Sequence, residues 1–477
     1  MKFEAAGWWN DLDWLSGLDA AFLAAETDVM PLNVGAILVF DKGTQSDIES
    51  YDRVLRLFAA RIHRFPHFRK KIVNAPWKLV QPYWVDYLSF SLSSHVHLAF
   101  ADEEVELEKV FEFAASILRL RLDRSRPLWD LYVLPRVDGN RLAIIAKLHH
   151  AVTDGISGME ALAGLFDSAQ NVDEDLRPKE HVPESPPSQF EVATRTFFGV
   201  AEHALSAISM GVSSAKELPH VVAGASNNDS VLEALGDMMP RPMRTGASRS
   251  ISAERKVISQ RLKVKDVVAV ARSSGVKVND VLLALSHAAV VAYLRAHGLD
   301  LPEALVAMVP ISIQGEPGAL DSKNKISAFF PTIPTSIADP IELLEKVHEI
   351  TERAKVVHSG VGPMFFYNIS QVVPPILVES VFNAVSKVEL FRLVPPPFNY
   401  VVSNVPGPNL DLFLAGNRLE AVYPLAPVSD GSGMTFAYVS YRGYVFLGLT
   451  VDPSLFPFAS EIPGFVSGIL QELLESG

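Results

Sequence analysis

The chain of 477 residues contains no cysteine. Disulfides, thiolate nucleophiles and cysteine-ligated metals are therefore excluded, and a reducing cytoplasm is compatible with the composition. Basic residues are in deficit, because 42 Lys and Arg face 55 Asp and Glu and the net charge is −13. Affinity for nucleic acid rests on Lys and Arg that neutralise phosphates, so we expect no nucleic-acid partner.

Long uninterrupted hydrophobic runs are also absent. The nearest candidate, residues 281–294, is broken by Ser286 and His287. It falls short of the roughly 18 consecutive apolar residues that indicate a membrane-spanning helix. Residues 1–19 carry acidic side chains where a secretory signal has a basic start and an apolar core. The sequence therefore predicts a cytoplasmic protein.

The residues that are present predict alternating helices and hairpin strands in both halves of the chain. Hydrophobic residues make up 48% of the sequence, enough for two large cores. Apolar periodicity predicts helices over 11–26, 46–65, 102–122, 264–274, 279–297 and 340–357, and strands over 33–41, 128–137, 141–150, 303–313 and 398–405. Residues 435–452 are predicted to form a hairpin that turns at Arg442 and Gly443. Regular strand–helix–strand alternation is missing, which disfavours a doubly wound parallel sheet.

A change of composition after residue 170 divides the chain. Residues 171–188 are polar and rich in proline, and a second loose stretch follows at 226–250. We predict an N-terminal domain over 1–175, a linker with one helix over 176–250, and a C-terminal domain over 251–477. The predicted fold class is α+β.

One stretch, AKLHHAVTDGISG, places His149, His150, Asp154 and Gly155 at the end of a predicted strand. A metal site is disfavoured, because adjacent strand residues point to opposite faces and the two imidazoles cannot share an ion. Two hypotheses remain open. Asp154 is a helix N-cap beside a core histidine, or one histidine faces a cavity as a general base while the other packs behind it.

The stretch HHAVTDG resembles the HHxxxDG signature of the CoA-dependent acyltransferase superfamily, which includes chloramphenicol acetyltransferase and the peptide-synthetase condensation domains. Three further segments resemble motifs of one branch, the bacterial wax ester synthase/diacylglycerol acyltransferase family. They are RPLWD at 126–130, VNDVLLA at 278–284 and SNVPGP at 403–408. The resemblance spans Leu15 to about Asp452. It departs from the family pattern at 32–35 and at Gln314.

The resemblance implies two domains that are each like chloramphenicol acetyltransferase, with mixed sheets, flanking helices and a tunnel between the domains. It implies transfer of an acyl group from acyl-CoA to diacylglycerol or a fatty alcohol, with His150 as the base and no metal or other cofactor. His149 and Asp154 are then structural supports of the catalytic site. The substrate-binding candidates are Trp129, Gly155, Asn279, Ser403 and Asn404.

Several alternatives stay open at this stage. Asn279 precedes an apolar helix, so it is either that helix's N-cap or a donor into the tunnel. Residues 361–385 are almost uncharged. We favour a buried helix pair there over a segment that lies on a membrane or lipid droplet. The rival functions are transfer to a carrier-bound polyketide or peptide intermediate, and a non-catalytic lipid-surface protein.

We expect the acyl group to pass directly from acyl-CoA to the acceptor, without an acyl-enzyme intermediate. The sequence has no cysteine and no Gly-x-Ser-x-Gly nucleophile elbow, so an acyl-enzyme has no obvious nucleophile. We therefore expect acyl-CoA and the acceptor to occupy the tunnel together.

Overall fold

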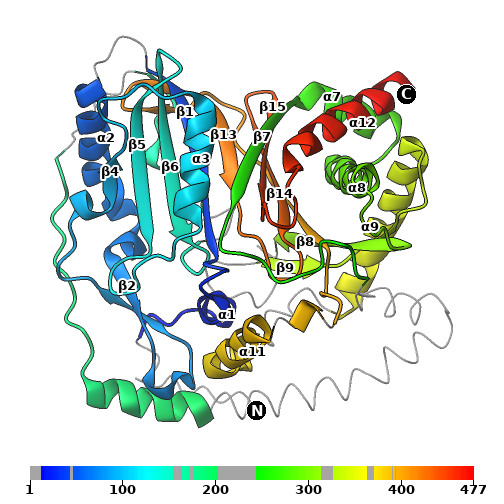
Figure 1. The fold of residues 1–477 in the computed structure, drawn as a ribbon. Coiled ribbons are helices and arrows are strands. Elements are labelled where there is room, and N and C mark those ends of the chain that lie inside the picture. The colour runs from blue at the N-terminus through cyan, green and yellow to red at the C-terminus, as the bar shows by residue number, and fades with distance from the viewer. Residues whose placement is uncertain are drawn as a thin grey trace.

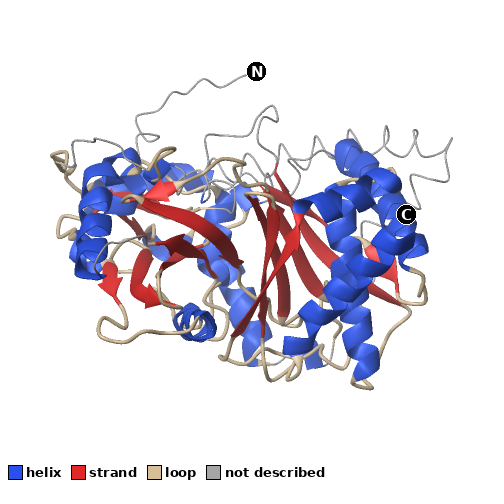
Figure 2. Cartoon of the chain, turned by 90° about the horizontal axis from the view of Figure 1, so that it is seen from above, coloured by secondary structure: helices blue, strands red, loops and turns tan. Residues whose placement is uncertain are grey.

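Two mixed β-sheets form the centre of the molecule, and helices flank both (Figures 1 and 2). The structure is a computed structural model. It describes residues 12–42, 47–153, 158, 164–170, 177–201, 243–312, 326–361, 370–388, 390–392 and 394–476. The α+β class with mixed sheets and flanking helices is confirmed.

The first sheet has six strands, and its neighbours are antiparallel except for one parallel pair at the edge. The order across the sheet is β12 (Phe413–Leu414), β13 (Asn417–Leu425), β1 (Asn33–Asp41), β6 (Arg141–His149), β5 (Trp129–Val137) and β4 (Val96–Leu98). A separate ribbon pairs β2 (Lys70–Val73) with β3 (Tyr83–Asp86).

The second sheet has seven strands and contains the parallel pairs β8–β11 and β11–β14. Its order is β10 (Thr332–Pro334), β8 (Ala304–Ser312), β11 (Tyr400–Val405), β14 (Met434–Tyr441), β15 (Tyr444–Val451) and β7 (Lys256–Lys263), and β9 (Ile326–Phe329) pairs with β8. Parallel and antiparallel pairs therefore meet within one sheet.

The longer helices lie mainly outside these sheets. They are α1 (Gly17–Ala25), α2 (Asp47–Arg61), α3 (Leu107–Leu118), α7 (Val264–Ser273), α8 (Val278–Ala296), α9 (Pro340–Val361), α11 (Pro375–Lys387) and α12 (Ile462–Ser476). Short 3₁₀ turns include η4 (Pro76–Lys78). Residues 189–201 form a further helix. The predicted helices at 46–65 and 102–122 are thus real but shorter.

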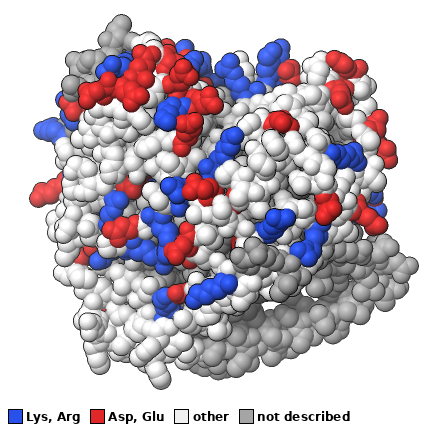
Figure 3. Space-filling model, in the orientation of Figure 1, with Lys and Arg blue, Asp and Glu red and all other residues white. Residues whose placement is uncertain are grey.

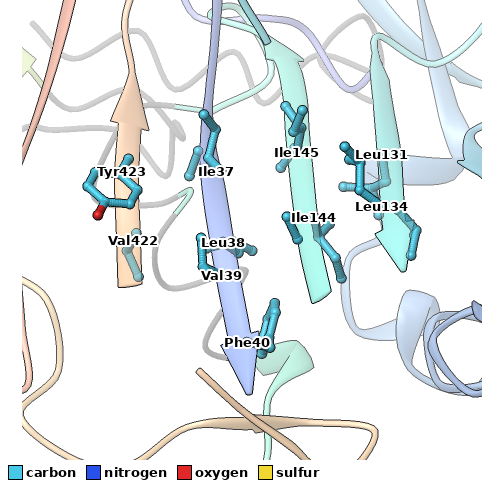
Figure 4. Close-up of a cluster of buried hydrophobic side chains, with 14 of the residues drawn as sticks. Ile37, Leu38, Val39, Phe40, Leu131, Leu134, Ile144, Ile145, Val422 and Tyr423 are labelled. Carbon is cyan, nitrogen blue, oxygen red and sulfur yellow. The ribbon is translucent and has the colours of Figure 1, made fainter. Parts of the chain in front are cut away.

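Apolar runs in the central strands form the core of the first sheet. Figure 4 shows side chains of β13, β1, β6 and β5 packed in adjacent rows. Ile37 and Ile145 face each other across the antiparallel pair β1–β6, and both are fully buried. Side chains buried on both faces of these strands explain why the sequence shows continuous apolar runs here, and not strict alternation.

The predicted hairpin of residues 128–150 is confirmed. β5 and β6 pair antiparallel and are joined through Asp138 and Gly139, whose φ angles are 44° and 82°. Positive φ at both central residues is the geometry of the turn that suits a right-twisted hairpin.

The sheets exchange chain segments in a way that the predicted division did not anticipate. β12 and β13 come from the second half of the sequence, yet β13 pairs with β1 in the first sheet. Where the two sheets cross, a Cβ on Gly448 of β15 would lie 1.8 Å from the carbonyl oxygen of Pro424 in β13. Glycine is therefore required at this close approach of two backbones.

Helix α8 is a core helix of the second half. Its length and composition alone would allow it to cross a membrane, but 72% of its most apolar window is buried inside the protein. It packs against α7, α9 and α12. Gly298 follows it with φ of 60°, the left-handed conformation that commonly closes a helix.

Candidate functional site

An apolar cavity of about 230 Å³ lies between the two sheets and is partly open to solvent. Its walls come from β1, β5, β6 and β13 of the first sheet and from β8, β11 and β14 of the second. Aliphatic and aromatic side chains dominate the lining. Polar groups are few, and they include His150 and the hydroxyl side chains of Thr153, Ser403, Ser429 and Thr435. An apolar cavity with a few converging polar groups is the usual form of a small-molecule site.

Strand β6 delivers His150 to this cavity. Ala146, Leu148 and His150 line the cavity, whereas Lys147 and His149 alternate with them and do not. The strand ends at His149 and the chain turns, with the backbone N–H of Val152 donating to the carbonyl of His149 at 2.9 Å. The period-two geometry of a strand therefore separates the two adjacent imidazoles, as predicted.

His150 is held in place by one contact to its backbone and one to its ring. Its backbone N–H donates to the carbonyl of Leu32 at 3.0 Å. The imidazole stacks on the ring of Phe22 in α1, with the centroids 3.9 Å apart and the planes inclined by 19°. An aromatic stack of this kind fixes the orientation of the imidazole without occupying its nitrogens. Phe22 also lines the cavity.

His149 is buried behind the cavity wall and only 1% exposed. Its Nδ1 accepts the backbone N–H of Ala151 at 3.0 Å, which fixes the proton of the neutral ring on Nε2. Burial, and the positive charge of Arg124, hold the pKa of His149 well below its usual value. A neutral, hydrogen-bonded His149 stabilises the turn that presents His150.

A buried carboxylate anchors the same turn from the other side. Glu26, whose side chain is 1% exposed, accepts hydrogen bonds from Arg121 Nε at 2.9 Å and Arg124 Nε at 2.8 Å. Its Oε2 lies 3.9 Å from His149 Nε2. Glu26 caps the C-terminus of α1, the helix that carries Phe22. One short helix therefore supports both histidines.

Trp129 and Ser403 contribute to the cavity from opposite sheets. Trp129 of β5 is 2% exposed and donates its indole N–H to the carbonyl of Phe68 at 2.8 Å. The donor is satisfied within the protein, so the ring offers the cavity an apolar surface. Ser403 lies on β11 and lines the facing wall.

Asn279 and Asn404 meet each other outside the cavity lining. Asn404 Nδ2 donates to Asn279 Oδ1 at 2.7 Å, which ties the start of α8 to β11. Neither residue is among those that line the cavity, because Asn404 alternates with Ser403 on its strand. Of the two alternatives for Asn279, the N-cap is wrong. The helix begins one residue earlier, Lys277 is its N-cap, and Asp280 accepts the Lys277 backbone N–H at 3.1 Å.

Asp154 and Gly155 lie outside the described residues, so their predicted roles stay predictions. The sequence reasoning missed Phe22 and Glu26. The apolar spacing of α1 indicated a packed helix but gave no partner. The nearby arginines Arg121 and Arg124 were a signal that could have suggested a carboxylate partner, but the sequence did not identify Glu26 as that partner.

The variant His149→Asn is expected to show a smaller dependence of the free energy of unfolding on pH below about 6.5. The native protein keeps His149 neutral, whereas the unfolded chain protonates it near a pKa of about 6.5. Between the lowered folded pKa and about 6.5 the unfolded state binds more protons. In this range the free energy of unfolding therefore rises with pH by up to about 1.4 kcal/mol per pH unit. As the pH falls through the same range, this contribution of His149 to stability is lost.

Urea midpoints of the wild type and of His149→Asn, measured from about pH 5 to about pH 7.5, test this prediction. Asparagine retains an acceptor for the Ala151 N–H and does not titrate. His287, whose pKa burial lowers to about 4, contributes the same slope to both proteins. If stability depended on pH equally in the wild type and in His149→Asn, His149 would not be the titrating group.

Solved structures share this two-sheet architecture and define the class of the fold. The wax ester synthase/diacylglycerol acyltransferase from Marinobacter aquaeolei VT8 aligns over 98% of this chain and 99% of its own, with a TM-score of 0.67 and 21% identity. The starter condensation domain of rhizomide synthetase RzmA, solved in complex with C8-CoA and Leu-SNAC, aligns over 97% of this chain and 94% of its own, with a TM-score of 0.56 and 12% identity. The fold is that of acyltransferases and condensation enzymes.

The sequence narrows this class to one family. Residues 15–282 match the wax ester synthase/diacylglycerol acyltransferase catalytic domain, and residues 323–473 match the corresponding C-terminal domain. The chain therefore belongs to the wax ester synthase/diacylglycerol acyltransferase family and is an acyltransferase. A Mycobacterium tuberculosis relative, provisionally named a diacylglycerol O-acyltransferase, is 27% identical over 98% of this chain and 91% of its own length.

Proposed function

We propose that this protein moves a long-chain acyl group from acyl-CoA to the hydroxyl of diacylglycerol or a fatty alcohol, giving triacylglycerol or wax ester. The observation that carries the proposal is His150, fixed on Phe22 at the wall of an apolar cavity between the sheets. The cavity suits a hydrocarbon chain, and the imidazole supplies a base. Neither a metal nor another cofactor takes part, and the protein acts on the cytoplasmic side of membranes or lipid droplets.

The neutral imidazole of His150 takes the proton of the acceptor hydroxyl. The hydroxyl oxygen then attacks the thioester carbonyl and forms a tetrahedral oxyanion. As the oxyanion collapses, the carbon–sulfur bond breaks and the imidazolium protonates the CoA thiolate. General acid–base catalysis of this kind contributes about 10²–10⁴-fold, and positioning in the cavity supplies the rest.

Relatives from Mycobacterium tuberculosis support this substrate class, since they carry names of diacylglycerol O-acyltransferases. The likeness to the rhizomide synthetase domain supports the donor, because that fold accommodates an acyl-CoA. The alternative, transfer to a carrier-bound polyketide or peptide intermediate, rests on fold likeness at 12–13% identity. It is the less supported of the two.

The purified protein, given hexadecanoyl-CoA with hexadecanol and dioleoylglycerol in parallel reactions, tests the proposal. We expect ester in at least one reaction, with one CoA released for each ester formed. Ester in neither reaction, together with transfer to a carrier-bound substrate, would favour the alternative.

A further inference from the structure

Helix α11 is exposed, contrary to the expectation that residues 361–385 form a buried pair. Among its residues Pro375 alone is fully buried, and Leu377 and Val381 are 56% and 59% exposed. Residues 362–369 lie outside the described part of the chain. An exposed, mostly apolar helix face of this kind is uncommon on a soluble protein and marks an interaction surface.

Two other apolar segments lie near α11. The turn η4 contacts α11, and the helix at 189–201 runs along the same lower edge of the molecule in Figure 1. Trp77 of η4 is 76% exposed, and Phe190 and Phe197 of the helix at 189–201 are 81% and 71% exposed. We call these residues, with Leu377 and Val381, the apolar platform. Phe190 and Phe197 are seven residues apart, and Leu377 and Val381 four apart, so each pair shares one face of its helix.

Specific contacts join the three segments. Lys78 Nζ lies 2.5 Å from Glu379 Oε2, which links η4 to α11. A Cβ on Gly199 would lie 3.1 Å from Val80 Cγ1, so the helix at 189–201 packs beside η4. Trp77 and Lys78 have φ of 55° and 54°, a conformation uncommon for non-glycine residues, and the indole remains in solvent. The protein maintains this exposed aromatic at a conformational cost.

The segments that carry the platform have nearly balanced charges, with Lys78, Arg195 and Lys387 against Glu191 and Glu379. Besides the Lys78–Glu379 pair, Arg195 contacts Glu191 at 2.6 Å within the helix at 189–201. The face over that helix and the β2–β3 ribbon shows few charged side chains in the lower left of Figure 3. A surface without an excess of Lys or Arg does not select an anionic membrane or a nucleic acid. It suits a lipid surface of zero net charge.

The platform is connected to the catalytic histidine through α1. Helix α11 packs on α1. The segment just before α11 also contacts α1, because the backbone N–H of Gly17 donates to Gln371 Oε1 at 3.0 Å. A Cβ on Gly17 would lie 2.1 Å from the carbonyl oxygen of Ser370, so the two backbones touch. Phe22 of the same helix α1 stacks on His150. The exposed surface is therefore one helix away from the cavity.

We propose that the apolar platform is the surface by which this protein docks on a zwitterionic phospholipid bilayer. The inference rests on the proposed function, since acceptors such as diacylglycerol reside in bilayers. Trp77, Phe197 and Leu377 enter the interfacial layer, and α11 lies along it. The bound protein then has α1 and the cavity next to the lipid that holds the acceptor.

Co-sedimentation with phosphatidylcholine vesicles tests the docking independently of catalysis. The triple variant Trp77→Ser/Phe197→Ser/Leu377→Ser is expected to bind vesicles at least about tenfold more weakly than the wild type, because each large apolar side chain contributes to burial in the lipid. The double variant Phe458→Ser/Leu410→Ser removes exposed apolar residues that are not part of the platform, and should bind like the wild type. Sodium chloride should not release the wild type.

A second assay separates failure of docking from failure of the proposed function. With octanoyl-CoA and octanol, both dissolved in water, the triple variant should turn over at the wild-type rate. Equal vesicle binding by the triple variant and the wild type would overturn the docking surface. Wild-type binding that requires anionic lipid and is reversed by salt would also overturn it. Wild-type dimers that dissociate in the triple variant, without vesicle binding, would assign the platform to a second copy of the chain.

Discussion

His150→Ala is expected to lower kcat by at least about 100-fold and to leave the fold intact, because it removes the only base that the mechanism uses. His150 lies in a turn at the cavity wall, where its ring packs on Phe22 and its backbone bonds to Leu32. The backbone bond is retained in the variant. The truncated ring leaves space that adjoins an existing cavity, so the loss of stability should be small.

The neighbouring histidine provides the control. His149→Ala removes the acceptor of the Ala151 N–H from a site that is 1% exposed, so it should reduce stability at least as much as turnover. Turnover with saturating acyl-CoA and acceptor, and circular dichroism of each variant, separate the two effects. Near-normal kcat in a well-folded His150→Ala protein would show that another group acts as the base.

Gly35→Ala is expected to reduce the free energy of unfolding by about 3 kcal/mol, the upper end for overpacking of a well-packed site. A Cβ on Gly35 would lie 1.8 Å from the carbonyl oxygen of Ala146 and 3.4 Å from the Cα of Lys147. Both contacts are to the backbone of β6, which cannot rotate away as a side chain can. The strand would have to shift, and it is the strand that delivers His150.

Gly468→Ala in α12 is the matched control with the opposite sign. No atom lies within 4 Å of the Cβ that would be added, and the residue is helical. Alanine there should stabilise the protein by about 0.4–1 kcal/mol, because it restricts the unfolded chain. Urea unfolding of the two variants beside the wild type measures both changes. A Gly35→Ala midpoint at or above that of the wild type would contradict the close approach of β1 and β6.

The placement of the two histidines could be predicted because it depends on local geometry alone. A strand followed directly by His149 and His150 must present them on opposite faces, and the structure has His150 at the cavity and His149 behind it. The β5–β6 hairpin was predictable for the same reason, since Asp138 and Gly139 specify its turn. Both features are set within about twenty residues of sequence.

Features that depend on distant segments could not be predicted in this way. β13 joins the first sheet beside β1, some 380 residues earlier in the chain, and periodicity does not reveal a pairing partner. The contact of Phe22 with His150 and the ion pair of Glu26 with Arg124 likewise join separate elements. The N-cap alternative for Asn279 was wrong because Asn279 and Asp280 are both polar residues at the start of α8. It is Asp280 whose side chain accepts the backbone N–H of Lys277.

Initial rates of CoA release test the central claim most directly, namely that the acyl group passes straight from the thioester to the acceptor hydroxyl at His150. The rates are measured against hexadecanoyl-CoA at several fixed concentrations of the preferred acceptor. Direct transfer requires both substrates in the cavity together, so the reciprocal plots should intersect, and no burst of CoA should appear without acceptor. Parallel lines, with an acylated protein in the intact-mass spectrum, would contradict the account.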